Sequence, residues 1–320
     1  MPIVSVVIPT YNAEKYLQRC LDSIATQDTE DYEVLIVNDG STDGTEKIAE
    51  DFTAKNPRFR IINQENSGVS VARKNGVSQA SGKYIWFIDS DDFILPGSLA
   101  KVVALIKDFP ETDTFYAPVM IREEANGKEW VKSYALTTTP EQSGKDYLKL
   151  KPVSVCPVQF VFRKALMGNP WVFFPEGLRH EDEYFCRVLQ YYSPSMYILN
   201  EPLYVYCQWS GSFMNTCSIQ HLYDMVEIYK HLYRFVEEGA DPEDRPWLLP
   251  DIFSFLVSTH FWYMDLFHTP EFKVFRRVNI SFIRKEFQKA APYIPTKEKL
   301  MDQLMLSYPN LLATLLRLKS

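Results

Sequence analysis

The chain has 320 residues, of which 46% are hydrophobic and 14% aromatic, enough for one large domain or two smaller ones with a packed core. Its formal net charge of -7 argues against nucleic acid as the main partner. The charge is uneven, because the residues from Glu271 onward hold 10 Lys and Arg against 4 Asp and Glu. A basic tail therefore follows an acidic body.

The 5 cysteines are widely spaced, and no two of them form a CxxC pair. This pattern is typical of free thiols in a reducing compartment, not of a disulfide framework or a zinc site. The N-terminal apolar run is too short for a signal peptide. The most apolar long stretch, residues 246–267, contains Asp251, His260 and Asp265, which favours a buried or interfacial helix over a membrane span. We therefore expect a cytoplasmic protein that is soluble or peripheral on the membrane.

The first hundred residues alternate between apolar runs and segments with helical spacing. Such near-continuous apolar strands between helices predict an α/β fold, with a mostly parallel sheet flanked by helices. Strands are predicted at residues 4–9, 32–38, 59–63 and 83–89, and helices at residues 13–27, 41–52, 68–80 and 96–109.

The alternation stops after residue 110. Residues 113–121 and 134–139 are predicted to be edge strands, and residues 122–133 and 140–155 to be loops. From His221 onward the pattern is helical. We predict one domain over residues 1–215 and a mainly helical C-terminal region over residues 216–320.

Polar side chains follow each of the first four predicted strands. Tyr11 follows the first and Asp39 ends the second, while Gly68 and Arg73 come after the third. The fourth runs into residues 89–92, DSDD, where three carboxylates within four residues repel one another. Ligands of open α/β sheets bind beyond the carboxyl ends of the strands, so we expect these side chains to meet at one edge.

This set of side chains suits a nucleotide diphosphate with a divalent metal. Mg²⁺ or Mn²⁺ binds one or two carboxylates together with phosphates and water, and a cation bound by one of these carboxylates would relieve the repulsion in DSDD. A helix start near Gly68 and the guanidinium of Arg73 suit a pyrophosphate. Each feature also has a purely structural interpretation: a turn at Asp39, a chance DxD pair, or a packed Tyr11.

Four segments in this order and spacing resemble the inverting family 2 glycosyltransferases of GT-A fold, over roughly residues 3–210: PTYNAEKYL, VNDGSTDGT, ENSGVSVARKNG and FIDSDD. The resemblance implies a nucleotide-sugar donor, which we expect to be UDP-linked, and a glycan or lipid-linked acceptor in bacterial cell-surface polysaccharide synthesis. It also implies Mn²⁺ or Mg²⁺ bound by Asp91 and Asp89, with Asp92 bracing the loop. The donor-binding residues that it implies are Pro9, Tyr11, Glu14, Asp39, Gly68, Arg73, Asp89 and Ser90. Asn38 departs from the family, which often has an aspartate there.

The segment RHEDEYF, residues 179–185, matches the downstream Glu-Asp motif of the same family. The mechanism needs a carboxylate that takes the proton of the acceptor hydroxyl, and we assign this role to Asp182, with Glu181 as the alternative. The segment also has the pattern of a helix start with acidic residues at its positive end. The role of His180 stays open. Trp171, Phe173 and Phe174 are candidates for stacking on acceptor sugar or for a structural role.

Two other functions remain as alternatives: a nucleotidyltransferase, whose phosphate loop would differ from PTYNAEKYL, and a non-catalytic nucleotide-sugar-binding protein. The basic tail raises a separate question. Residues 274–294 mix Lys and Arg with Phe, Ile and Val, which is typical either of a helix on an anionic inner leaflet or of a helix packed on the catalytic domain.

Overall fold

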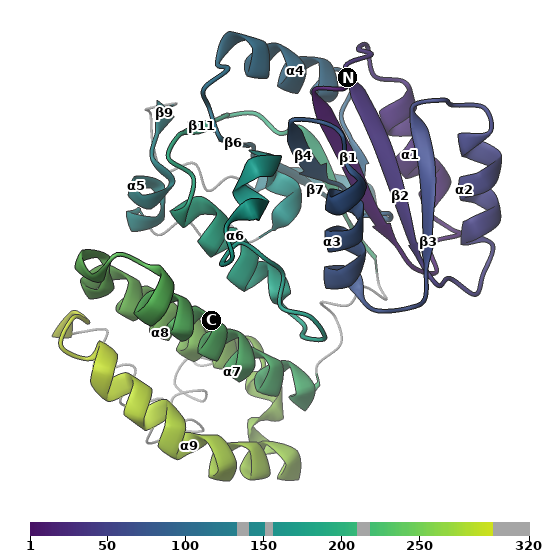
Figure 1. Ribbon diagram of the computed structural model, residues 1–320. Coiled ribbons are helices and arrows are strands. Elements are labelled where there is room, and N and C mark those ends of the chain that lie inside the picture. The colour runs from purple at the N-terminus through teal and green to yellow at the C-terminus, as the bar shows by residue number, and fades with distance from the viewer. Residues whose placement is uncertain (133–140, 151–155, 210–217, 297–320) are drawn as a thin grey trace. The chain divides into compact units, whose positions relative to one another are not determined.

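The computed structural model describes residues 1–132, 141–150, 156–209 and 218–296. The chain forms two compact units, shown in Figure 1. The first consists of Met1–Gly177 and Glu181–Ser210, and the second of Leu178–His180 and Gly211–Ser320. The predicted assignment of catalysis to residues 1–215 stays a prediction.

An eight-stranded sheet forms the centre of the first unit, in the order β3-β2-β1-β4-β10-β6-β11-β9. Its first four strands are parallel, and they are the four that the apolar runs predict. Helices connect these strands. The α/β fold predicted from the sequence is therefore confirmed. The bounds are β1 Val4–Thr10, α1 Leu17–Ala25, β2 Tyr32–Asp39, α2 Thr45–Thr53, β3 Phe59–Gln64, α3 Val69–Gln79, β4 Tyr84–Phe87 and α4 Ser98–Asp108.

β1, β2 and β4 are almost fully buried on both faces because helices cover both. On one face, Val6 and Ile8 of β1 belong to the same core as Leu21 of α1. On the other face, α3 approaches the sheet so closely that a Cβ on Gly76 would lie 2.3 Å from Val7 Cγ1. Gly76 therefore permits close packing of α3 against β1, and Figure 1 shows α3 beside these strands.

The second half of the sheet is mixed, because β10 is antiparallel to both β4 and β6. A smaller sheet has the order β5-β12-β7-β8. The remaining bounds of the first unit are β5 Phe93–Ile94, β6 Thr114–Tyr116, β7 Val119–Glu123, β8 Lys128–Lys132, β9 Glu141–Gln142, α5 Gly144–Lys149, β10 Phe160–Arg163, α6 Glu181–Tyr191, β11 Met196–Ile198 and β12 Tyr204–Gln208.

Three predictions for this middle region are wrong. Residues 113–121 form two strands, β6 and β7, which lie inside different sheets and not at an edge of either. The predicted loop 122–133 contains β8, which pairs with β7 although all five of its residues are exposed. The predicted loop 140–155 contains β9 and α5, whose start is capped by Ser143. The predicted strand 134–139 lies outside the described residues.

The second unit is helical, as the pattern from His221 onward predicts. Tyr229 of α7 donates a hydrogen bond to Glu286 of α9, with Oη and Oε2 3.1 Å apart, and the rings of Phe253 and Phe287 join α8 to α9. In the described part of the chain, no helix is long and apolar enough to cross a membrane. The bounds are α7 Ile219–Arg234, α8 Arg245–Trp262 and α9 Pro270–Ala290.

Candidate active site

The loops that follow β1 and β2 are joined by hydrogen bonds. The Asn12 N–H donates to Ser41 Oγ at 3.0 Å, and the Gly44 N–H donates to Glu14 Oε2 at 2.9 Å. Asn12 adopts a φ of 49°, a left-handed conformation that Asn tolerates better than most residues. Tyr11 stands beside this junction with 52% of its surface exposed, in a position to contact a ligand. Pro9, by contrast, is buried within β1 opposite Val37.

Asp39, at the end of β2, organises the loop that leads into α3. Its Oδ1 accepts from the Ser67 N–H at 2.8 Å and from Gln64 Nε2 at 2.7 Å, and its Oδ2 accepts from the Gly68 N–H at 2.8 Å. A carboxylate oxygen has two lone pairs, so Oδ2 retains the capacity to accept another hydrogen bond. Gly68 has a φ of 87° and lies exposed at the start of α3.

Asn38 has a structural task that accounts for its amide. Its Nδ2 donates to Asn63 Oδ1 at 3.0 Å, which joins β2 to β3, and its Oδ1 accepts from the Ser41 N–H at 3.2 Å. An aspartate here has no N–H to donate, so the contact would require the Asn63 amide to flip and donate to the carboxylate.

Arg73 joins α3 to two carboxylates on other elements. Only 4% of its surface is exposed; Nη1 lies 2.6 Å from Glu181 Oε1 and Nη2 lies 3.2 Å from Asp89 Oδ1. Burial by itself would lower the pKa of Arg73, but the negative charges of Asp89 and Glu181 outweigh it and raise the pKa. Arg73 is thus a permanent cation between the end of β4 and the start of α6.

The DSDD segment contains two kinds of carboxylate. Asp92 is buried and accepts from Tyr204 Oη at 2.5 Å and from the Cys207 N–H at 2.7 Å, so its predicted bracing role is confirmed. Asp91 makes no such contacts with other described residues, and burial together with the charge of Asp89 raises its pKa to about 6. Ser90, between Asp89 and Asp91, is half-buried.

Burial and the charge of Asp89 both disfavour a negative charge on Asp91, and a divalent cation would favour it. Among the described residues no group of three or more His, Cys, Asp or Glu side chains is arranged to hold a metal. Mg²⁺ and Mn²⁺ need only one or two carboxylates where phosphate oxygens and water complete the shell. The pair Asp91 and Asp89 therefore fits a metal that is bound together with a diphosphate.

Arg19 and Tyr204 support the same loop and could not be recognised in the sequence. Arg19 Nη2 donates to the Asp91 backbone oxygen at 3.1 Å, and Tyr204 Oη lies 3.2 Å from the Asp89 N–H. Arg19 occupies a polar position of an ordinary amphipathic helix, and Tyr204 belongs to a strand remote in sequence, so no local pattern marks either residue.

The candidate base lies in the first turn of α6. Burial, with the neighbouring charges of Glu181 and Glu183, raises the pKa of Asp182 well above its ordinary value. Its Oδ1 accepts only from the Glu183 N–H, at 3.0 Å, among the hydrogen bonds of the described residues. Glu181 is held by Arg73 instead. A carboxylate with a raised pKa that is not held in an ion pair is the better proton acceptor of the two.

The three aromatic residues that precede α6 differ in how deeply they are buried. Phe174 is buried and stacks on Phe185 with ring centroids 3.8 Å apart, so of its two alternatives the structural role is the one observed. Trp171 and Phe173 are half-buried. The Tyr184 hydroxyl donates to the Trp171 backbone oxygen at 3.0 Å.

His180, the residue before α6, belongs to the second unit. Its Nε2 lies 2.8 Å from His221 Nδ1, and its φ of 62° places it in the left-handed region. Burial, with the positive charge of Arg179 and the nearby His221, lowers the pKa of His180 to about 4. These contacts give His180 a structural role.

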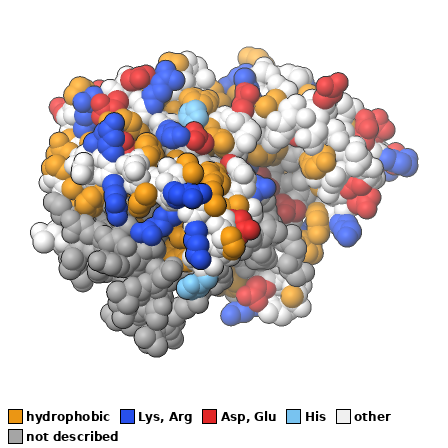
Figure 2. All heavy atoms as spheres, turned by 90° about the horizontal axis from the view of Figure 1, so that it is seen from below, with side chains coloured by type: hydrophobic (Ala, Val, Ile, Leu, Met, Phe, Trp, Pro, Cys, Tyr) orange, Lys and Arg blue, Asp and Glu red, His pale blue; other side chains and the backbone are white. Residues whose placement is uncertain are grey.

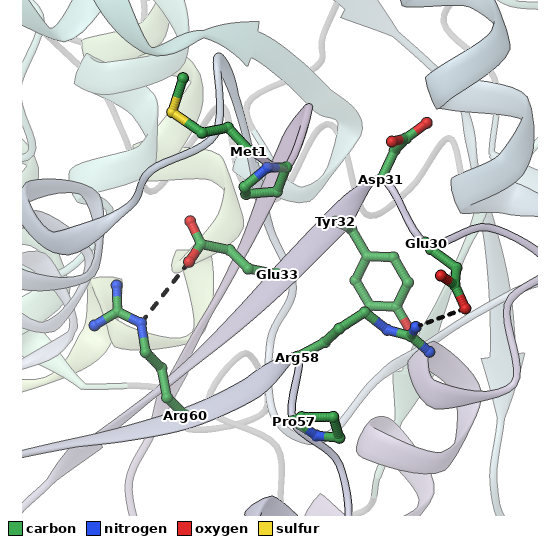
Figure 3. Close-up of a pocket in the computed structure, with 9 residues that line it drawn as sticks. Met1, Glu30, Asp31, Tyr32, Glu33, Pro57, Arg58 and Arg60 are labelled. Atoms are coloured by element: carbon green, nitrogen blue, oxygen red, sulfur yellow. Dashed lines mark ion pairs between the residues drawn. The ribbon is translucent and has the colours of Figure 1, made fainter.

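A hollow of about 480 Å³ lies at the opposite ends of the parallel strands, and Figure 3 shows its lining. Two arginines face it, but each is paired with a carboxylate: Arg58 with Glu30 at 3.4 Å and Arg60 with Glu33 at 3.8 Å. These pairs neutralise the cations that an anionic ligand would need. The carboxyl-end cluster of Asp39, Arg73, Asp89 and Asp91 remains the stronger candidate.

Comparisons with known proteins find relatives that match most of the chain. A family model described as glycosyl transferase family 2 matches residues 5–169. EpsH of Bacillus subtilis, named as a glycosyltransferase, is 32% identical over 249 residues, which is 76% of this chain and 72% of EpsH.

Solved structures share the fold at lower identity. Staphylococcus aureus TarS residues 1–349 with UDP-GlcNAc has a TM-score of 0.61 at 23% identity and covers 83% of this chain and 85% of that one. The mannosyltransferase PcManGT of Pyrobaculum calidifontis with GDP-Man and Mn²⁺ has a TM-score of 0.55 at 15% identity, covering 97% and 88%.

Proposed function

This chain belongs to glycosyltransferase family 2 and has the GT-A fold, and from that premise we propose which transfer it carries out. The resemblance in its sequence is confirmed, and it is an enzyme that transfers a glycosyl group. We propose that the donor is a UDP-linked sugar. The acceptor in this proposal is a hydroxyl of a glycan or lipid-linked glycan in cell-surface polysaccharide synthesis, and the transfer inverts the anomeric configuration.

One observation carries the proposal: Arg73 contacts Asp89 and Glu181 at the same time. This joins the end of β4, which is proposed to face the donor and metal, to the first turn of α6, which carries the proposed base. Donor and base side chains then lie at one edge of the sheet, as a direct displacement requires.

The donor would lie across the ends of β1 to β4. The exposed ring of Tyr11 offers a stacking surface to the nucleobase of the donor. Asp39 Oδ2 can accept a hydrogen bond from an N–H of that nucleobase. The open start of α3 at Gly68 suits the diphosphate. Arg73 is proposed to act on the donor through Asp89, because its guanidinium is buried. TarS was solved with UDP-GlcNAc, which supports a UDP-linked donor.

Asp91 and Asp89 would hold Mn²⁺ or Mg²⁺. When bound, the metal neutralises charge on the diphosphate as it leaves. Arg19 and Asp92 fix the position of these two ligands through the loop backbone and through Tyr204. The Mn²⁺ in the PcManGT complex supports this cofactor.

Asp182 would accept the proton of the acceptor hydroxyl on one of its carboxylate oxygens. The acceptor oxygen forms a bond to the anomeric carbon as the bond from that carbon to the diphosphate oxygen breaks. The electron pair of the broken bond leaves with the nucleotide diphosphate. One displacement of this kind inverts the anomeric centre and leaves no sugar attached to the enzyme. The raised pKa of Asp182 supports this role.

The reaction is proposed to occur in the cytoplasm. Cys20, Cys156, Cys186 and Cys207 are free thiols, which supports a reducing compartment.

Donor binding and turnover together test the proposal. We would measure the melting temperature with UDP-GlcNAc, UDP-glucose, UDP-galactose and GDP-mannose, each with and without Mn²⁺. A donor at 100 times its dissociation constant stabilises the folded state by about 2.7 kcal/mol. A UDP-sugar should stabilise the protein only with Mn²⁺ and should release UDP when acceptor is added. Stabilisation by GDP-mannose alone would reject a UDP-linked donor, and pyrophosphate release from a nucleoside triphosphate would identify a nucleotidyltransferase.

A further inference from the structure

Helix α9 has two chemically different faces. One face packs into the second unit, where Phe272, Phe275, Ile283 and Phe287 are buried. Each helical residue advances about 100° around the axis, and the exposed residues from Lys273 to Lys285 occupy one continuous arc of about 140° on the other face.

The exposed arc of α9 combines positive charge with apolar side chains. Its cations are Lys273, Arg277, Arg284 and Lys285, and we call them, with Val274 and Val278, the basic face. Val274 is 45% exposed and Val278 is 63% exposed. Figure 2 shows Lys and Arg gathered with hydrophobic side chains on the side of the molecule where α9 lies in Figure 1.

The charges of the basic face are not neutralised within the part of the chain that the structure describes. None of the four cations forms an ion pair with another described residue, and Glu271 is the one exposed acid of the helix. Glu286, the other acid of α9, is buried and pairs with Lys289 at 2.8 Å. The chain as a whole carries a charge of -7, so this cluster runs against its overall charge.

We propose that the basic face of α9 binds the surface of a bilayer rich in anionic lipid. Each Lys or Arg near such a surface contributes about fivefold to binding. Val274 and Val278 project from the exposed surface of α9, so they can insert between lipid headgroups while the long basic side chains reach the lipid phosphates. An acidic protein would match the charges, but apolar anchors between proteins fill pockets rather than project from a basic surface.

The sequence leaves two alternatives for this stretch, an anionic membrane surface and the catalytic domain, and the proposal assigns the exposed face to the membrane. α9 packs through its aromatic face and presents the opposite face to lipid. The inference needs neither a sugar donor nor an acceptor, so it can be tested independently of the proposed transfer.

Vesicle flotation of the full chain tests the proposal. The probes are phosphatidylcholine vesicles with and without phosphatidylglycerol, at low and at high salt. The wild-type protein should float with the anionic vesicles at low salt, and binding should fall at high salt. The double variant R277Q/R284Q should bind about 25-fold more weakly, which is two charges at about fivefold each.

Two further variants separate charge from apolar insertion. V274S/V278S should bind several-fold more weakly while its salt dependence stays the same, because its charges are intact. K47Q/K55Q removes the same charge from exposed lysines at α2 in the first unit and should bind like wild type. Circular dichroism melting confirms that each variant is folded.

Several outcomes would overturn the proposal. Wild-type protein that stays unbound with anionic vesicles at low salt excludes it. If K47Q/K55Q lost as much binding as R277Q/R284Q, the binding would depend on net charge and not on the basic face. If R277Q/R284Q bound like wild type, the binding surface would lie outside the basic face. Binding to polyglutamate without binding to vesicles would identify an acidic protein as the partner.

Discussion

Arg73 and Glu181 lie 108 residues apart in the sequence, and their side chains form a buried ion pair with Nη1 and Oε1 2.6 Å apart. The same guanidinium contacts Asp89 at 3.2 Å. One cation therefore fixes the relative positions of α3, the end of β4 and the start of α6. The arrangement of the site depends on this contact as much as on the residues proposed to touch substrate.

Replacement of Arg73 should destabilise the fold. Arg73→Met leaves two carboxylates without their cation, and breaking a buried ion pair in this way costs about 3–5 kcal/mol. Arg73→Lys keeps the charge but not the planar fork that reaches two carboxylates, so its loss should be intermediate. Urea unfolding measures both free energies.

Lys74→Met is the matched control for this prediction. Lys74 is the next residue along α3, and its pair with Glu176 at 2.9 Å is exposed, so its contribution is at most about 1 kcal/mol. Equal losses in Arg73→Met and Lys74→Met would show that the buried contact does not stabilise the site.

The two final carboxylates of DSDD should respond differently to mutation. Asp91→Asn should lose most of the Mn²⁺-dependent affinity for UDP, because an amide replaces a charged ligand. EDTA should have the same effect on the wild-type protein. The measurement is UDP affinity by calorimetry with and without Mn²⁺. Wild-type metal-dependent affinity in Asp91→Asn would exclude the assignment of Asp91 as a metal ligand.

Asp92→Asn should act through stability instead. Both Asp92 oxygens accept hydrogen bonds, from Tyr204 and from the Cys207 N–H, and the amide places an N–H against one of these donors. A buried donor left without an acceptor costs about 1–3 kcal/mol. We expect a lower unfolding free energy while UDP affinity still depends on Mn²⁺.

His180 should make the protein less stable in mild acid. Its pKa is lowered to about 4 in the folded chain, against an ordinary value of 6.5, so only the unfolded chain takes up this proton between those values. The stabilising effect of the neutral imidazole is therefore complete above pH 6.5 and is lost as the pH falls toward 4. The slope is about 1.4 kcal/mol per pH unit for one proton.

His180→Asn isolates this contribution, because Asn tolerates the φ of 62° at this position. The difference between the unfolding free energies of wild type and variant should shrink as the pH falls from 6.5 to 4. His268→Asn, at an exposed histidine of the same unit, is the control for the loss of an imidazole outside this buried contact. Parallel pH profiles for wild type and His180→Asn would rule out the effect.

The sequence predicts the parts of the site that depend on local order. Parallel strands end at one edge, so the positions of Tyr11, Asp39 and Asp89 follow once the apolar runs are recognised as strands. The pairing of Arg73 with Glu181 does not follow, because a lone arginine on a helix has no local pattern that names its partner. β8 is missed for the same reason: its five exposed residues are held by pairing with β7 and not by an apolar periodicity.

The sequence also predicts the solvent exposure of individual side chains less well than it predicts helices and strands. Arg73 has the chemistry of a phosphate ligand, but Phe87 and Phe174 flank its guanidinium at 5.7 and 4.9 Å, which removes it from solvent. Phe174 likewise has the chemistry of a sugar platform and lies in the core. Burial of both residues is set by the packing of α3 and α6, which joins segments that are far apart in the chain.

Asp182→Asn should reduce sugar transfer by at least about 100-fold, because a general base contributes about 10²–10⁴-fold and an amide cannot take the proton. UDP affinity should remain near that of wild type, since the base contacts the acceptor and not the nucleotide. Glu181→Gln is the comparison: it weakens the pair with Arg73, so we expect a loss of stability with a smaller loss of rate. Initial transfer rates, UDP affinities and unfolding free energies of the two variants separate these roles. A fully active Asp182→Asn beside an inactive but folded Glu181→Gln would move the base to Glu181, and full activity in both would leave the first turn of α6 with a structural role alone.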